Sequence, residues 1–432
     1  MLTLPELYPL VLGWLQAMEA PGGRTAVGAL AHLVAALLTG QSLRPSALMR
    51  ALWSSSPVPA RQRYKRVARA WERPWLTPAW LTPLLVRVAV ALVPPERAGS
   101  PTAGLTHVAL DSVRCGPWEV FTLGVVWHGR VLPVCWRVLA YPWPKGQVTP
   151  AVCALVEQVA GSWPVDRPAH LVADRAFPSR PLLQTLRRVG WGWTIRLRAN
   201  TGVRAGGEDL QVRDLIERAR LGGWTAWIGG YGRGATSLAA TLVVGRGVVV
   251  LPRHQRTVGT QRHRAARQRE RLRKCSYEYQ IRQTDPWVAL CTSHPTWRAA
   301  VTSYRRRWAT EGTYRDAQSG WDGQHGWDLE PVLTRLACHA QAERLIGLWA
   351  LGTVLQTWIG SQVAHGPDGV RAIAAQWTTT GRLSLWAHGQ FALAEPSGFL
   401  HDWLINTLQD GARRIEQLAH AHPPPEPACR AA

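Results

Sequence analysis

Two aspartates follow apolar runs in the sequence, and both are of a type that can take part in metal or acid–base chemistry. Asp111 follows "HVAL" and Asp174 follows "HLVA". Both runs predict buried strands, so each carboxylate lies toward the C-terminal part of a strand, where α/β sheets bind ligands. A single aspartate at such a point is also a common turn or cap residue. The pair therefore needs a further chemical partner before it indicates a site.

A third carboxylate, Glu311, lies in a basic and aromatic segment, residues 303–324. This segment, "SYRRRWATEGTYRDAQSGWDGQ", holds four arginines, two tyrosines and two tryptophans but one glutamate. The alternative to a chemical role is an exposed Arg307–Glu311 ion pair, which is common and weak. Four residues spaced by three, four and seven positions share one face of a helix predicted over 296–320: Tyr304, Arg307, Glu311 and Gln318.

The elements that must position these residues change character along the chain. Residues 1–98 are predicted to be helical, 105–200 to form three strands followed by helix, strand, helix and strand, and 201–290 to be a β-rich insertion. A further strand is predicted over 286–293, residues 291–330 carry the glutamate helix, and residues 331–432 are again helical. This order predicts a mixed sheet covered by helices. We therefore expect an α/β core that is interrupted by the insertion and flanked by N- and C-terminal helical domains.

The net charge of the chain is +22, with 50 basic against 28 acidic residues. This excess indicates a polyanionic partner, most simply nucleic acid. Arginine carries nearly all of the positive charge, a skew that a GC-rich genome also produces, but such a skew does not explain the shortage of acids. The seven cysteines are dispersed singly, as is typical of a reducing cytoplasm. We expect neither a signal peptide nor a membrane span.

Two segments concentrate the positive charge. Residues 60–75 predict a basic and aromatic helix, which indicates either a face that meets DNA phosphates or an ordinary solvated face. Residues 253–274 carry nine basic residues and one acid, which indicates either a DNA-facing arm or a solvated charge run. The residues of the first segment that we expect to bind DNA are Arg61, Arg63, Lys65 and Arg66.

The segment around Glu311 resembles the signature of the DDE transposases of bacterial insertion sequences. That signature reads Y-x2-R-x3-E-x6-K, and Tyr304, Arg307 and Glu311 match it at the right spacing. Gln318 stands at the lysine position, so any phosphate contact there lacks a positive charge, although an amide can still donate a hydrogen bond. Arg315, on a nearby face, is a candidate to replace that charge.

The contexts of the two aspartates resemble the same family. "LDS" around Asp111 and "ADRAF" around Asp174 are similar to the settings of its first and second catalytic aspartates. The resemblance covers roughly 105–330. It implies an RNase H-like core with a β-rich insertion between the second aspartate and the glutamate.

Three carboxylates suit the cleavage of a DNA phosphodiester bond with bound divalent cations. Mg²⁺ prefers oxygen ligands, and two ions about 3.5–4 Å apart can activate the nucleophile and neutralise the leaving oxygen. We expect Asp111 to bridge two Mg²⁺ ions and Asp174 and Glu311 each to hold one, with Mn²⁺ as a substitute. Arg307 then contacts a phosphate bidentately, and Tyr304 stacks or hydrogen-bonds at the cleaved end.

The resemblance implies a cut-and-paste transposase that binds the terminal inverted repeats of its element, cuts there and joins the freed ends to target DNA. It also implies a homodimer that brings the two ends together. We expect residues 1–98 and 253–274 to bind the repeats, residues 331–432 to be a candidate dimerisation region, and the protein to be cytoplasmic and nucleoid-associated. Two alternatives remain open: a catalytically inactive DNA-binding protein that keeps the fold, and a metal-dependent nuclease without strand transfer.

Overall fold

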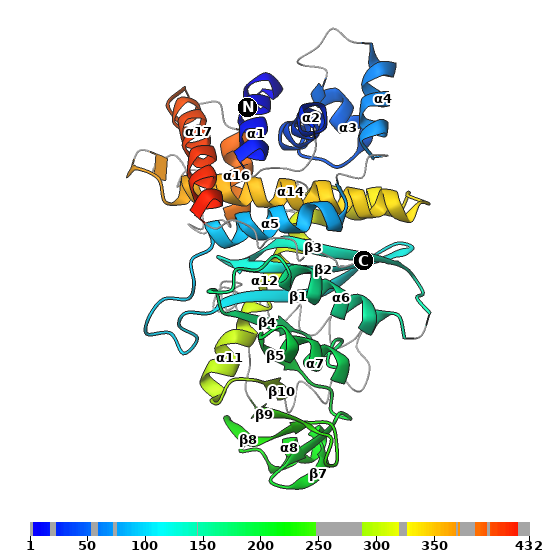
Figure 1. Cartoon of the computed structure of the whole chain (residues 1–432), viewed down its shortest axis with the longest axis vertical. Coiled ribbons are helices and arrows are strands. Elements are labelled where there is room, and N and C mark those ends of the chain that lie inside the picture. Colours follow the sequence, from blue (N-terminus) through cyan, green and yellow to red (C-terminus); the bar gives the residue numbers. More distant parts are fainter. Residues whose placement is uncertain are drawn as a thin grey trace, which may run out of the picture. The chain divides into compact units, whose positions relative to one another are not determined.

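The computed structural model divides the chain into two compact units. Unit 1 comprises Met1–Pro94, Ala109–Arg167 and Ala309–Ala432, and unit 2 comprises Pro95–Val108 and Pro168–Trp308. Figure 1 labels most of the elements of both units. The structure describes residues 3–17, 23–52, 59–71, 76–144, 146–247, 287–318, 326–368, 370–371, 385–394 and 398–421.

A three-stranded meander forms the sheet of unit 1. Its strands lie in the order β3 (Arg130–Ala140), β2 (Trp118–Trp127) and β1 (Thr106–Cys115), and β1 joins the unit at Ala109. β2 and β3 are antiparallel. A two-residue turn joins them, in which His128 and Gly129 have φ angles of 45° and 77°. Positive φ at both positions is the pattern of a tight hairpin turn whose twist matches that of its strands.

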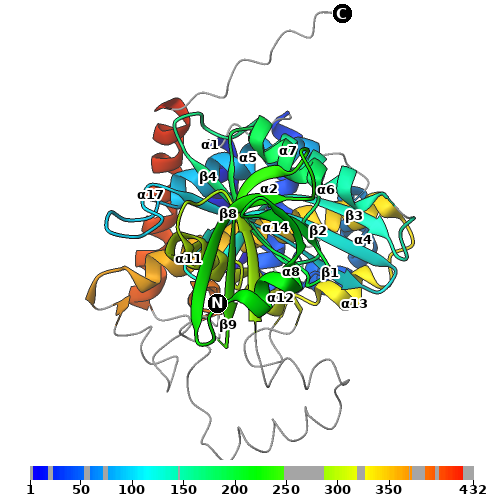
Figure 2. The same cartoon turned by 90° about the horizontal axis from the view of Figure 1, so that it is seen from below.

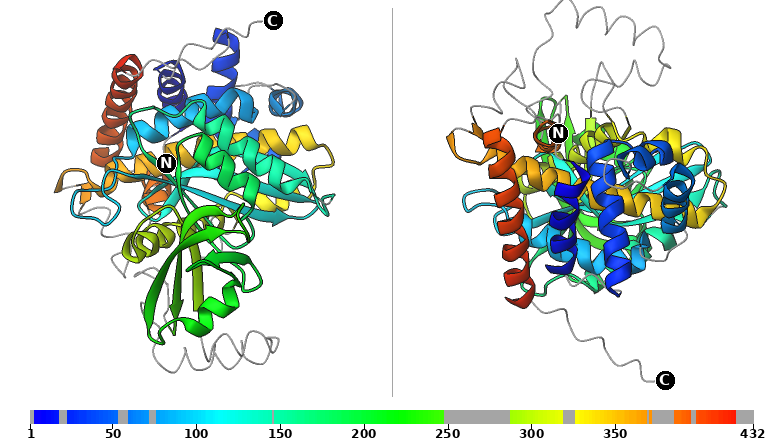
Figure 3. Two further views of the ribbon diagram at one scale, coloured as in Figure 1. Left: turned by 60° about the horizontal axis from the view of Figure 1, so that its bottom comes forward. Right: turned by 90° about the horizontal axis from the view of Figure 1, so that it is seen from above.

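Helices from both ends of the chain complete unit 1. They are α1 (Leu4–Ala17), α2 (Arg24–Gly40), α3 (Pro45–Ala51), α4 (Ala60–Trp71), α5 (Pro78–Leu92), α6 (Val148–Ala160), α12 (Ala309–Gln318), α13 (Leu329–Leu333), α14 (His339–Ala364), α16 (Leu385–Ala394) and α17 (Gly398–Ala421). α1 and α17 lie side by side (Figure 3). Within the described ranges, no single helix has the length and apolar composition to cross a membrane, although the bent pair of α2 and α3 together meets that test.

α14 is the central helix of unit 1. Every residue from Leu345 to Ser361 is buried, and a helix buried on all sides is a core element rather than a surface one. It contacts α2, α5, α16 and β3, and Figure 1 shows it lying along α5 and β3. A Cβ at Gly347 would lie 2.2 Å from the carbonyl oxygen of Leu76. Glycine at this position therefore permits the close approach of the chain that precedes α5.

A mixed sheet forms the centre of unit 2. Its strands lie in the order β4 (Ala169–Ala173), β5 (Gly192–Arg196), β10 (Trp287–Thr292), β9 (Leu238–Arg246), β8 (Gly223–Tyr231), β6 (Gly202–Ala205) and β7 (Glu208–Gln211). β4 and β5 are parallel and the other neighbours are antiparallel. The helices are α7 (Arg180–Arg188), α8 (Val212–Arg218) and α11 (Trp297–Arg306). Figure 2 shows the long β8–β9 hairpin and α8 beside it.

The mixed α/β class predicted from the sequence is confirmed, and the strands and helices from β1 to β5 occur in the predicted order. Strands β6 to β9 lie in the range that was predicted to be rich in β-structure. The basic segment 253–274 lies outside the described residues.

The single helix predicted over 296–320 is wrong, because two helices occupy this range. α11 ends at Arg306 and α12 begins at Ala309. At the break, the Arg307 amide donates to the carbonyl oxygen of Tyr304, three residues back, instead of four. Tertiary packing overrides the helical periodicity here, because α11 contacts β4, β5 and β8 whereas α12 contacts β3. The signature residues therefore do not share one face of one helix.

Candidate active site

Asp111 lies within β1 rather than at its end, because the strand continues to Cys115. The strand is buried as far as Leu110, is partly or fully exposed from Asp111 to Arg114, and is buried again at Cys115. Oδ2 of Asp111 accepts a 2.6 Å hydrogen bond from the Thr310 hydroxyl, and Oδ1 accepts one of 2.9 Å from the backbone amide of Ser112. The carboxylate is thus held at the point where the strand becomes accessible.

α12, which carries Glu311, is hydrogen-bonded to all three strands of the unit 1 sheet. These contacts fix the helix against the sheet, and Glu311 is half-buried in its first turn. The bonds run from the Thr310 hydroxyl to Asp111 on β1 (2.6 Å), between the hydroxyls of Tyr314 and Thr122 on β2 (2.6 Å), and from the Val131 amide on β3 to the Thr313 hydroxyl (2.7 Å).

An ion pair between Arg130 and Asp316 reinforces the contact of α12 with β3. Asp316 is 2% exposed, and burial raises the pKa of its carboxyl while the Arg130 guanidinium opposes that rise. Gly312 lies against the same guanidinium, because a Cβ there would be 2.6 Å from Nη1 of Arg130. A side chain at the residue that follows Glu311 would therefore displace the Arg130 guanidinium.

Asp174 directly follows β4, as predicted. Its Oδ1 accepts a hydrogen bond of 3.3 Å from the Tyr304 hydroxyl and lies 3.8 Å from Nη1 of Arg196 on β5. Tyr304 is 1% exposed. Burial, followed by the charge of Asp174, raises the pKa of this phenol, so the hydroxyl keeps its proton and donates.

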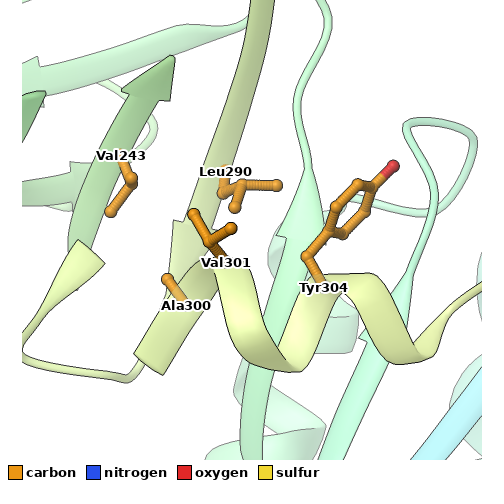
Figure 4. Packing of buried hydrophobic residues seen from close by; sticks show 5 residues of the cluster. All are labelled: Val243, Leu290, Ala300, Val301 and Tyr304. Carbon is orange, nitrogen blue, oxygen red and sulfur yellow. The ribbon is translucent and has the colours of Figure 1, made fainter. Parts of the chain in front are cut away.

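A hydrophobic cluster in unit 2 fixes the position of Tyr304. α11 packs its apolar face onto β9 and β10, and Figure 4 shows the Tyr304 ring at one end of this contact. The cluster consists of Val243, Leu290, Ala300, Val301 and Tyr304. The same packing that forms the core thus holds the Tyr304 hydroxyl beside Asp174.

The remaining signature residues are largely engaged within the protein. Arg307 is 5% exposed, and its guanidinium lies 4.6 Å from the centre of the Trp308 ring. The Gln318 side chain hydrogen-bonds the thiol of Cys115 on β1, and burial raises the pKa of that thiol to about 12. Arg315 is exposed. Of these three residues, Arg315 has the side chain that is most open to a partner.

The basic face predicted for α4 is present only in part. Arg61 and Lys65 are exposed, but Arg63 is 1% exposed and therefore does not belong to that face. Arg63 precedes the buried Val67 by four residues, so both side chains point to the packed side of the helix. The side chain of Arg66 lies outside the described residues.

A buried hydrogen-bond chain beneath α11 involves residues that were not predicted from the sequence. Ser303 is fully buried, and its Oγ lies 2.9 Å from Nε2 of His107 and 2.8 Å from Nε2 of His294. Nδ1 of His107 lies 3.5 Å from Glu96, which pairs with Arg306 at 2.5 Å. If His107 donates to Glu96, then Ser303 donates to His107 and accepts from His294.

A third histidine, His170, stacks on His294 with ring centres 4.1 Å apart. Burial lowers the pKa of all three rings, and that of His294 falls to about 4. The Glu96–His107–Ser303 order is that of a hydrolase triad, but no substrate reaches a serine with 0% exposure. This chain of hydrogen bonds is therefore structural and not catalytic. The sequence did carry a signal for it, because a histidine precedes each aspartate by four residues, in "HVALD" and "HLVAD".

The predicted ligands fit a hard divalent cation in their chemistry, because all three supply carboxylate oxygens. Asp111 and Glu311 belong to unit 1 and Asp174 to unit 2. Among the residues that the structure describes, no three His, Cys, Asp or Glu side chains are grouped closely enough to hold a metal ion. Within its own unit, each aspartate contacts the segment around Glu311, Asp111 through Thr310 in unit 1 and Asp174 through Tyr304 in unit 2.

Comparison with known families agrees with the resemblance found in the sequence. Residues 145–325 match the family model of the transposase DDE domain. The match includes Asp174 and the segment with Tyr304 and Glu311, whereas Asp111 precedes it. No curated protein matches the chain.

Proposed function

We propose that this chain, whose residues 145–325 match the family model of the transposase DDE domain, cuts and rejoins DNA at the ends of a mobile element. One observation carries the proposal. Both predicted catalytic aspartates contact the segment that contains Glu311, since Asp174 accepts from Tyr304 and Asp111 accepts from Thr310. The meander of β1 to β3 followed by alternating helices and parallel strands supports an RNase H-like core.

The proposed cofactor is a pair of Mg²⁺ ions, which Mn²⁺ can replace, held by Asp111, Asp174 and Glu311. When bound, the ions neutralise phosphate charge and lower the pKa of the attacking hydroxyl. Tyr304 and Arg196 both contact Oδ1 of Asp174 and so restrict the rotation of that carboxylate. The packing of α12 on three strands restricts the movement of the helix that carries Glu311.

The proposed reaction has two steps. Water first hydrolyses a phosphodiester bond at the end of the element, which frees a 3′-hydroxyl. That hydroxyl then attacks a phosphodiester of the target DNA, so that one P–O bond forms as another breaks. The chain contributes positive charge to hold both DNA partners, and its net charge of +22 supports this role.

Recognition of the element ends is proposed for the N-terminal helices and for residues 253–274. Arg61 and Lys65 of α4 are the exposed basic residues available for phosphate contacts in the first of these. A complete reaction needs both ends of the element, so we propose that two copies of the chain act together as a homodimer, with residues 331–432 as the candidate contact.

The test is cleavage of labelled duplexes that carry the inverted repeats bracketing the gene, with and without Mg²⁺. We expect Asp111→Ala, Asp174→Ala and Glu311→Ala each to abolish cleavage while binding of the same duplex is retained. Glu157→Ala, which removes an exposed carboxylate from α6, is the matched control and should cut normally. If any one of these three carboxylate variants cuts at the normal rate, the residue that it lacks has no part in the mechanism.

The same assay separates the two alternative functions. Repeat-specific binding without any Mg²⁺-dependent nicking would identify an inactive DNA-binding protein. Cleavage without joining to a target duplex would identify a nuclease. Strand transfer products that depend on all three carboxylates would support the transposase.

A further inference from the structure

The hydroxyl of Thr310 connects the helix that carries Glu311 to the first aspartate. Thr310 is the second residue of α12 and is 2% exposed. Its Oγ1 donates to Oδ2 of Asp111 at 2.6 Å, a short distance typical of a hydroxyl that donates to a charged carboxylate. This bond joins residues that lie 199 positions apart in the chain.

The contact fixes both the orientation and the place of the carboxylate. Oδ1 of Asp111 accepts from the Ser112 amide at 2.9 Å, so the two carboxylate oxygens each have a donor and rotation of the group is restricted. The N-terminal turn of α12 also favours a negative charge beside it. Because Glu311 is covalently next to Thr310, the same bond sets the position of the helix start relative to Asp111.

We propose that Thr310 is a positioning residue, whose hydroxyl holds the Asp111 carboxylate in the orientation needed to bind the divalent cation. The inference rests on the proposed function, since it presumes that Asp111 is a metal ligand. Partners that orient metal-binding carboxylates typically change metal affinity or activity by about 10–100-fold when they are removed.

Two substitutions at Thr310 isolate the hydroxyl. Thr310→Val keeps the branched shape and removes the donor, whereas Thr310→Ser keeps the donor and removes a methyl group. We expect Thr310→Val to weaken Mn²⁺ binding, followed by electron paramagnetic resonance of the full-length protein, by about 10–100-fold. Thr310→Ser should bind Mn²⁺ nearly as well as the unaltered chain.

Thr82→Val provides a matched control in the same unit. The Thr82 hydroxyl is buried on α5, which carries no predicted site residue, and accepts from the Gln158 side chain of α6 at 3.3 Å, so its loss should lower the urea midpoint without changing the Mn²⁺ dissociation constant. If Thr310→Val lowers stability as Thr82→Val does but leaves Mn²⁺ binding unchanged, the role of Thr310 is structural and the inference is overturned. Equal losses of Mn²⁺ affinity in Thr310→Val and Thr310→Ser would overturn the inference as well.

A double variant separates this inference from the function on which it rests. If Thr310 acts through Asp111, then Thr310→Val should weaken Mn²⁺ binding no further in an Asp111→Ala background. If Asp111→Ala alone leaves Mn²⁺ binding intact, the proposed metal site itself fails. If Asp111→Ala weakens binding and Thr310→Val does not, only the positioning role fails.

Discussion

The Tyr304 hydroxyl donates a hydrogen bond to Oδ1 of Asp174 across 3.3 Å, although 130 positions separate the two residues in the chain. Tyr304 is otherwise a core residue, packed with α11 against β10. Its pKa is raised by burial, so the phenol stays protonated through the neutral range. The ring therefore packs in the core, and the hydroxyl donates to Asp174. A substitution that removes only the hydroxyl oxygen distinguishes these two roles.

Tyr304→Phe is expected to keep the fold and to slow DNA cleavage. The ring remains in place, so the free energy of unfolding should change by about 1 kcal/mol, while the loss of the donor to Asp174 should lower the single-turnover rate by about tenfold or more. Tyr231→Phe is the control, because it removes a hydroxyl that donates to the Pro178 carbonyl oxygen at 3.0 Å in the same unit. Equal cleavage rates for the two variants would show that the Tyr304 hydroxyl has no part in the reaction.

Gly312→Ala is expected to destabilise unit 1. The new Cβ would lie 2.6 Å from Nη1 of Arg130, and a displaced guanidinium leaves the buried Asp316 carboxylate without its partner. We expect a loss of about 1–3 kcal/mol in the free energy of unfolding, measured by urea denaturation. Gly13→Ala in α1 is the control: no atom lies within 4 Å of its Cβ, so a neutral or slightly stabilising effect is expected. A neutral Gly312→Ala would mean that Arg130 rearranges at no cost.

Stability is expected to fall on acidification because of the buried histidines. The pKa of His107, His170 and His294 is lower in the folded protein than the ordinary value of 6.5, and that of His294 is about 4. The unfolded chain therefore binds protons below pH 6.5 before the folded chain does, so stability is fully present above pH 6.5 and is lost as the pH falls toward 4. Each histidine contributes a slope of up to about 1.4 kcal/mol per pH unit.

Urea midpoints between pH 8 and pH 4.5 measure this effect. His294→Asn should flatten the dependence even if it lowers the midpoint at pH 8, because the variant lacks one of the titrating rings. The exposed His128 is the control position, and His128→Asn should leave the slope unchanged. An unchanged slope in His294→Asn would show that another group is responsible for the acid sensitivity.

The accessibility of the α4 side chains predicts different effects for neighbouring basic residues. Arg61→Ala and Lys65→Ala remove exposed charges, so each should weaken DNA binding and reduce the salt dependence of the binding constant by about one unit of slope. Arg63 is buried, so Arg63→Ala should lower the thermal midpoint instead. Fluorescence anisotropy at several salt concentrations measures the first effect. If neither Arg61→Ala nor Lys65→Ala changes the salt dependence of the binding constant, this face of α4 does not contact DNA phosphates.

The local sequence pattern predicted much of the framework around the site. The apolar run before Asp174 indicated a strand that this residue follows, and β4 ends at Ala173. The break between α11 and α12 was not predictable from helical periodicity, because it results from packing on different strands. The burial of Arg63 was missed for a related reason: composition gives the charge of a helix but not which of its faces is covered.

Of the two residues that hold the aspartates, Tyr304 was singled out in the sequence, as a contact for the cleaved DNA end, whereas Thr310 was not. Thr310 and Ser303 act through hydroxyl groups on partners far away in the chain, and no local pattern encodes such a pairing. His107 and His170 were detectable in principle, because alternation along a strand puts a residue four positions before each aspartate on the same face. That signal becomes meaningful only once the histidines are known to be buried together.

Unit 1 is assembled from three separate stretches of chain, the last of which begins at Ala309. α14 belongs to that last stretch, yet it contacts α2, α5 and β3. During synthesis, the N-terminal helices therefore leave the ribosome well before their central partner exists, and such long-range contacts form slowly. A product of premature termination before α14 would consequently expose the apolar faces of these helices, and we expect it to aggregate or be degraded instead of persisting as a smaller DNA-binding protein.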